Sequence, residues 1–231
     1  MIDFSSLLPF ALVGGLLGLD VVSFPQVMVS RPIVAATIGG AMTGNAMAGL
    51  SVGVFLELVA LGTLPFGASR YPEWGSASLA GGALHGLALQ YGGPADGALI
   101  LAALAGLLAA WAGGITMVWL RRLNAAWARR VLQELHAGDA RTIIGLQLSG
   151  LSADYLRGVV LTLVVMLLAI PPIQMGMDAW PSLPAVSGAV LTTMGGIVAA
   201  GAVWKLFHAV PRSRWLFMSG LLVGFVILLV S

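Results

Sequence analysis

The sequence predicts an all-α, polytopic membrane helix bundle, with broken or re-entrant helices in the N-terminal part and an interfacial amphipathic helix in mid-chain. Two observations predict this class. Hydrophobic residues make up 59% of the 231 residues and charged residues only 9%, whereas a water-facing domain carries about a quarter charged residues. Apolar runs recur from end to end, several of them near the length of about 20 residues that crosses a bilayer as a helix.

The predicted domain organisation is a single integral membrane domain over residues 1–231, because the apolar runs leave no soluble appendage. Continuously apolar runs rich in Ala, Leu and Gly favour helices over the period-two strands of an outer-membrane barrel. The chain has no cysteine, which excludes thiolate chemistry, and its net charge of +2 is too small to suggest nucleic acid. We expect a multi-pass protein of the bacterial inner membrane.

Residues 1–97 are predicted to form a broken-helix substrate region. The apolar segments there are short and are interrupted by Gly, Pro and polar residues: Leu7–Leu19, Ile33–Met42, Ala46–Leu64 and Ala77–Leu89. Unwound backbone between such segments can bind a polar solute inside a protein-lined cavity, whereas lipid-facing unpaired backbone is costly. The alternative interpretation is surface loops between mediocre helices.

The rest of the chain is predicted to contain a span over 98–120, a cytoplasmic amphipathic segment over 121–157 and three spans over 158–231. Gly138 is predicted to end a helix and Asp139 to cap the next one. Within the middle segment, a helix lying in the membrane surface and a helix packed under the bundle are both compatible with the pattern. Four apolar residues there recur every four positions and so share one helical face: Leu123, Trp127, Val131 and Leu135.

The arginines of 121–157 predict the orientation of the chain, because loops rich in Lys and Arg stay in the cytoplasm. Lys205–Arg214 is also basic and is predicted on the same side. Pro171–Pro184 contains no Lys or Arg and is predicted outside. Ser152 with Asp154 is predicted to begin the span that follows the arginine cluster.

Four polar residues in the first third of the chain are candidates for binding a solute. Glu57 stands in an apolar run, where an ionisable group costs roughly 2.5–3.5 kcal/mol, so a cavity role is the default hypothesis. Asp20, Gln26 and Arg31 offer acceptors and donors that suit sugar hydroxyls, and Arg31 can pair with Glu57 or Asp20. The structural alternatives are a bonded carboxyl at Glu57, a capping Asp, a loop Gln and a snorkelling Arg.

The loop Pro65–Trp74 combines small residues with aromatic ones. Gly67 and Ala68 allow a ligand to approach the backbone closely. Tyr71 or Trp74 can stack on a sugar ring, or both can be ordinary interfacial aromatics.

No catalytic residue, metal site or cofactor is predicted. The three histidines are scattered without a metal-ligand spacing. The sequence also lacks a glycine-rich phosphate loop of the Walker type, so the chain itself is not expected to consume ATP.

Two motifs in the first third carry a family resemblance. The first is the stretch from Leu19 to Ala35, LDVVSFPQVMVSRPIVA, and the second is the stretch from Gly53 to Ala68, GVFLELVALGTLPFGA, which Tyr71-Pro72 follows. They resemble the IIC component of the mannose/fructose/sorbose family of the sugar phosphotransferase system. The basic middle segment and the late apolar spans are similar to the rest of that family.

The resemblance implies a sugar-translocating subunit that pairs with a similar IID membrane subunit, the pairs assembling as trimers. A separate IIB protein, itself charged by IIA, phosphorylates the sugar on the cytoplasmic side, so no phosphorylated residue is expected on this chain. Carried over position by position, the resemblance puts Gln26, Arg31, Glu57, Gly67 and Ala68 at or near the sugar pocket. With Asp20 and Pro72, these are the substrate-binding residues that we predict.

One departure from the family pattern stands in the second motif. Pro65 occupies a position where many mannose transporters of this family have Asn, and Pro lacks both the side-chain amide and a backbone donor. This predicts a different mode of binding or a sugar other than mannose. Two further readings stay open: an ion-coupled secondary transporter that uses Glu57, and a non-transporting membrane scaffold.

Overall fold

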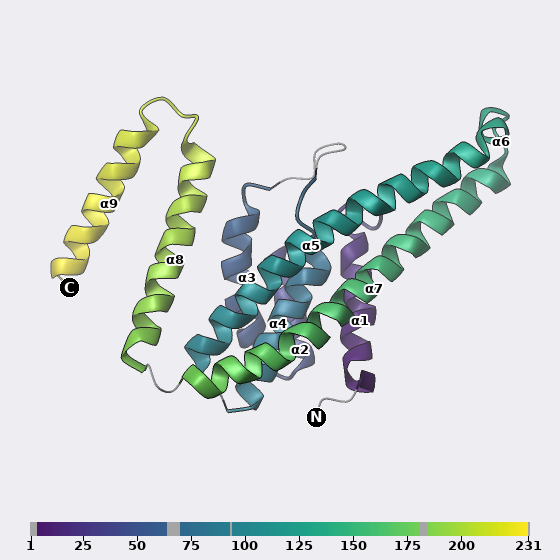
Figure 1. Cartoon of the computed structure of the whole chain (residues 1–231). Helices are drawn as coiled ribbons and strands as arrows, with labels where there is room; N and C mark the ends of the chain where they lie inside the picture. Colours follow the sequence, from purple (N-terminus) through teal and green to yellow (C-terminus); the bar gives the residue numbers. More distant parts are fainter. Residues whose placement is uncertain (1–3, 64–69, 93, 181–183, 231) are drawn as a thin grey trace.

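The computed structural model describes residues 4–63, 70–92, 94–180 and 184–230. Within these residues all the regular structure is helical, which confirms the all-α class (Figure 1). In chain order the helices are α1 (Phe4–Leu19), α2 (Pro32–Met42), α3 (Ala46–Ala60), α4 (Trp74–Gln90), α5 (Ala95–Arg130), α6 (Leu132–His136), α7 (Ala140–Ala179), α8 (Pro184–Phe207) and α9 (Ser213–Val230).

The N-terminal third is built from short helices, as the sequence predicts. Helices α1 to α4 have 16, 11, 15 and 17 residues, too few to cross a hydrocarbon core of about 30 Å at about 1.5 Å per residue. Helix α2 starts with Pro32 at its first position, where the missing N–H costs nothing. A tight turn then leads to Asn45, whose side chain accepts a hydrogen bond from the Ala48 amide at 3.0 Å and begins α3. The interrupted helices of this region are therefore confirmed.

Glycines bring α2, α3 and α4 into backbone contact. A Cβ atom added to Gly82 of α4 would lie 2.0 Å from the carbonyl oxygen of Ala36, and one added to Gly49 of α3 would lie 2.2 Å from the same oxygen. Small residues allow this approach inside a membrane, where packing replaces the hydrophobic effect between helices. The three helices thus form a rigid block beneath the polar loops of this region.

We expect Gly82→Ala to destabilise this block by about 1 to 3 kcal/mol, because backbone must move to make room for the methyl group. The matched control is Gly196→Ala on α8, since a Cβ there meets nothing within 4 Å. Thermal unfolding in detergent compares the two variants. Equal midpoints for both would show that the contact between α2 and α4 is less tight than these distances indicate.

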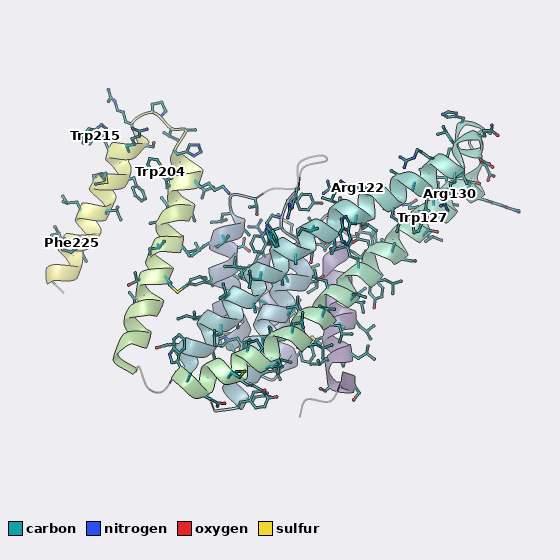
Figure 2. All side chains as sticks on the ribbon, in the orientation of Figure 1. Arg122, Trp127, Arg130, Trp204, Trp215 and Phe225 are labelled. Carbon is teal, nitrogen blue, oxygen red and sulfur yellow. The ribbon has the colours of Figure 1, made fainter. Side chains whose placement is uncertain are left out.

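Helices α5 and α7 are long antiparallel rods. Their 36 and 40 residues correspond to about 54 and 60 Å at the usual rise, and both are long and apolar enough to cross a membrane. Their outer parts, joined by α6, project well beyond the short helices (Figure 1). We call residues 121–157 the arm. Figure 2 places Arg122, Trp127 and Arg130 on its α5 side.

The expected amphipathic segment over 121–157 takes the form of the arm: residues 121–130 continue α5 without a Gly or Pro to interrupt it, and α6 follows. Its position relative to the membrane surface stays a prediction. Gly138, at φ +73°, and Asp139, which accepts a hydrogen bond from the Thr142 amide at 3.0 Å, do mark the turn as predicted. Hydrogen bonds from the Thr142 side chain and amide hold the pKa of the exposed Asp139 carboxyl below its ordinary value.

Helix α7 also overturns two predicted boundaries. Ser152 and Asp154 lie within this helix and do not begin it. Pro171 and Pro172 lie inside it as well, so the expected outer loop is shorter than Pro171–Pro184. Proline is tolerated there because neighbouring helices and small local adjustments can satisfy the freed carbonyls of a membrane helix.

The two basic regions of the chain lie at one end of the molecule. Figure 1 shows the tip of the arm and the link between α8 and α9 at the same end, with the end of α7 and the start of α8 at the other. This agrees with one cytoplasmic side for both arginine-rich regions. The crossing of the membrane by the three segments of 158–231 stays a prediction.

Candidate functional site

The link between α1 and α2 (residues 20–31) is a polar loop organised by one buried carboxylate. Asp20 is 2% exposed. Its Oδ1 accepts from the Val27 amide at 2.7 Å, and its Oδ2 accepts from the Ser30 amide at 3.0 Å and the Ser30 hydroxyl at 2.8 Å. The backbone of Gln26 and Met28 has φ of +60° and +67°, a conformation that non-glycine residues keep only where the surroundings impose it. Asp20 therefore determines the shape of the predicted sugar loop.

We expect Asp20→Ala to destabilise the protein by about 2 kcal/mol, because several donors lose a charged acceptor inside the protein. Gln26→Ala is the control for stability, since Gln26 is exposed and its amide donates to the Val22 carbonyl in its own loop, at 2.9 Å. Its unfolding midpoint should stay close to that of the unchanged protein. Thermal unfolding followed by circular dichroism measures both. Equal midpoints for the two variants would contradict the role of Asp20.

Glu57 of α3 forms an ion pair with Arg31, which immediately precedes α2. The Ile33 amide at the start of α2 also donates to Glu57 Oε2, at 3.2 Å. The Arg31 and Glu57 side chains are 27% and 18% exposed, so both are largely removed from solvent. Of the two partners considered for Arg31, the structure selects Glu57. The pair and the positive end of the α2 dipole compensate the carboxylate within an apolar helix.

The other predicted site residues divide between the two loops. Gln26 lies exposed in the loop of Asp20. Pro72 lies in the segment 70–73 before α4, which we call the second loop and which packs against α5: a Cβ on Gly114 would sit 3.5 Å from Pro72 Cα. Gly67 and Ala68 fall outside the described residues. The structure thus brings Arg31 and Glu57 into contact and places Asp20 and Gln26 in the same loop as Arg31.

The two aromatics of the second loop do not have either role considered for them. Tyr71 is 5% exposed and Trp74 8% exposed, so neither is an interfacial aromatic or an open stacking platform. The Arg121 guanidinium lies 5.1 Å from the Tyr71 ring centroid. Trp74 packs in the apolar core, and its indole N–H donates to Thr63 Oγ1 at 2.9 Å. Burial follows from the packing of α4 and α5 around them, which local sequence does not reveal.

A buried charged cluster on α7 was missed by the sequence analysis. Asp154 is 1% exposed and accepts from Arg157 Nε at 2.9 Å. It also accepts a hydrogen bond from the Ser23 hydroxyl, which belongs to the loop of Asp20. Arg157 Nη1 reaches Thr116 Oγ1 of α5 at 3.4 Å. The cluster therefore ties the polar loop to both long helices. The sequence signal that could have predicted this cluster was the acidic Asp154 and the basic Arg157, three positions apart and beside an apolar run.

Glu73 is a second buried acid that the sequence analysis left without a role. It is fully buried and caps α4, accepting a hydrogen bond from the Ser76 amide at 3.1 Å. Its own amide donates to the Ala110 carbonyl of α5 at 2.9 Å. Its second oxygen has no hydrogen-bond partner among the described residues. Glu73 thus begins α4 while locking its loop onto α5.

Comparisons with solved structures support this architecture. A structure described as a membrane protein has a TM-score of 0.70 and 19% identity, covering 97% of this chain and 88% of the other. A chain of a cryo-EM structure of the mannose transporter ManYZ with microcin E492 has a TM-score of 0.61 and 22% identity, covering 100% of this chain and 88% of that one. At these identities the likeness concerns the fold. No curated protein sequence matches the chain.

A family model carries the assignment further. The model described as the sorbose-specific IIC component of the phosphotransferase system matches residues 5–231. That match covers nearly the whole chain and includes the polar loop, the Arg31–Glu57 pair and the arm. This membrane protein therefore belongs to the family of sorbose-specific IIC components, the sugar-translocating membrane subunits of the phosphotransferase system.

Proposed function

We propose that this chain imports a hexose or a related neutral sugar and that the polar region between α1, α2 and α3 handles it. The Arg31–Glu57 pair carries the proposal. It joins a shaped polar loop to a helix that is otherwise apolar. Paired charges offer donors and acceptors without a net charge, which suits a neutral polyol bound by many modest hydrogen bonds.

The pair also supports a transport cycle of alternating access. The loop of Asp20 and the start of α2 contact α3 through this ion pair, whereas the glycine contacts hold α2, α3 and α4 as one block. In the cycle that we propose, this block moves against α5 and α7 and exposes the polar loop to either side in turn, which requires the bonds of Glu73 to α5 and of Ser23 to Asp154 to open. Phosphorylation on the cytoplasmic side traps the sugar, because a charged phosphate does not return through an apolar route.

The ion-coupled alternative finds less support. Both carboxylate oxygens of Glu57 are engaged, one by Arg31 and the other by the Ile33 amide. A carboxylate that carries a proton through the cycle has to release these partners at each turnover. The contacts of Glu57 are instead those of a lasting ion pair with Arg31.

The product that accumulates in membrane vesicles tests the proposal. Vesicles carrying the complete complex should accumulate sugar phosphate when phosphoenolpyruvate and the soluble carriers are supplied, and a protonophore should leave the rate unchanged. Accumulation of unmodified sugar that stops with the protonophore would instead establish the ion-coupled mechanism. A complex with no uptake at all would favour the scaffold.

The partners are also proposals. We infer a IID membrane subunit in pairs that assemble as trimers in a bacterial inner membrane, with IIB and IIA acting from the cytoplasm. The family assignment supports membrane partners of the phosphotransferase system. Purification of the complex from native membranes with a tag on this chain, followed by native mass spectrometry, gives its composition. A lone chain would contradict the proposed assembly.

A further inference from the structure

A cavity of about 450 Å³ lies at the base of the arm. Its walls come from three segments: Ser23 and Phe24 of the polar loop, Asn124 and Trp127 of α5, and Gln147 of α7. The volume lies within the range of about 300–1,000 Å³ that is usual for small-molecule sites. The cavity occupies the arginine-rich end of the molecule, so it faces the cytoplasm under the positive-inside rule.

The lining combines three polar side chains with apolar residues. Two amides and one hydroxyl provide donors and acceptors, and two aromatic rings provide apolar faces. Among the described residues that line the cavity, none carries a formal charge. Such a set suits a neutral molecule with several hydroxyl groups, because each hydroxyl can both donate and accept while the ring carbons lie against an aromatic face.

One lining group is a buried polar atom that the described part of the chain leaves unpaired. Asn124 Oδ1 is buried and has no hydrogen-bond partner among the described residues. A buried acceptor left unpaired costs about 1–3 kcal/mol, and a rotation of the Asn124 side chain would bring this oxygen to a ligand hydroxyl in the cavity. Gly150 of α7 keeps the space open, since a Cβ there would lie 3.5 Å from Asn124 Nδ2.

The cavity is mechanically connected to the proposed sugar region. Ser23, which lies three residues before Gln26, lines the cavity, and its hydroxyl donates a hydrogen bond to Asp154. We propose that this cavity is a cytoplasm-facing subsite for the neutral sugar, separate from the Arg31–Glu57 region, where the sugar rests before it is phosphorylated. The inference rests on the proposed function for the identity of its ligand.

Protection of an introduced cysteine tests the subsite, because the natural chain has none. Ala128 lines the cavity, whereas Ala125, one turn earlier on α5, is exposed and does not. The variants Ala128→Cys and Ala125→Cys are reacted with N-ethylmaleimide in inside-out vesicles. The rate of alkylation is measured in the presence of D-mannose, L-sorbose, D-fructose or D-glucose and compared with the rate in salt of equal osmolality. At a sugar concentration twice its dissociation constant, we expect alkylation at position 128 to slow about threefold, since only the empty fraction reacts. Position 125 should react at an unchanged rate.

A filling substitution separates binding in the cavity from effects at a distance. Gly150→Leu in the Ala128→Cys background should abolish the protection by sugar, while Gly145→Leu should keep it, because a Cβ on Gly145 meets nothing within 4 Å. Absence of protection by all four sugars overturns the subsite, whatever the uptake shows. Protection without formation of sugar phosphate keeps the subsite and contradicts the proposed function, so the two failures are distinguishable.

Discussion

Glu57→Ala is expected to reduce sugar uptake to background and to destabilise the protein by about 2 to 3 kcal/mol. The substitution leaves the Arg31 guanidinium without its partner in a largely desolvated place. Breaking a fully buried pair in this way costs about 3–5 kcal/mol, and the partial exposure of both side chains, 27% and 18%, lowers that figure. Uptake of radiolabelled sugar by cells carrying the whole complex gives the first quantity, and thermal unfolding of the purified chain gives the second.

A charge swap makes this prediction specific to the pair. Arg31→Glu combined with Glu57→Arg restores opposite charges, so it should recover part of the lost stability. Recovery should be incomplete, because the Ile33 amide now donates to Glu57 and would face a guanidinium instead. Glu134→Ala on the exposed α6 is the control and should leave uptake and stability unchanged. Normal uptake by Glu57→Ala would show that the pair has no part in transport and would favour the hypothesis of a non-transporting scaffold.

The second large effect is expected at the cluster on α7. Arg157→Met should destabilise the protein by about 3–5 kcal/mol, because it leaves Asp154, 1% exposed, as a buried charge without its counter-ion. Arg130→Met, the same substitution on the exposed part of the arm, should have little effect. Unfolding midpoints of the two purified variants provide the measurement. A stable Arg157→Met protein would show that Asp154 is compensated by other groups.

Removing the whole charged pair separates stability from transport. Asp154→Leu with Arg157→Met replaces both charges by apolar side chains of similar size, which often restores stability. The double variant still lacks the acceptor for the Ser23 hydroxyl, so its polar loop is released from α7. We therefore expect near-normal stability together with low sugar uptake. Uptake equal to that of the unchanged protein would mean that the anchor has no part in transport.

The short helices show how far local sequence reaches. The apolar segments predicted over Leu7–Leu19 and Ile33–Met42 coincide within three residues with α1 and α2, because hydropathy and helix caps act over a few positions. Gly138 and Asp139 mark the turn of the arm for the same reason. By contrast, Asp154 was interpreted as a helix start, because an acid beside an apolar run looks the same in sequence at the start of a helix and inside one.

The predicted site residues show where local reasoning ends. The carboxyl at Glu57 and the basic residue Arg31 were both recognisable as candidates. Whether Arg31 pairs with Glu57 or with Asp20 depended on which helix packs beside the loop. Asp20 turned out to hold its own loop instead. Tyr71 and Trp74 have the same ring chemistry at a membrane surface and in a core, and only the packing of α4 on α5 buries them.

By itself the sequence determined the membrane class, the broken helices of the first third and the basic end of the molecule, since each of these depends on composition within one helix length. The tertiary structure decided the Arg31–Glu57 pair, the continuation of α5 and α7 into the arm, and the hydrogen bond from Ser23 to Asp154 across 131 positions. These features depend on the meeting of distant segments, and their energies arise only when packing removes the paired groups from water and lipid.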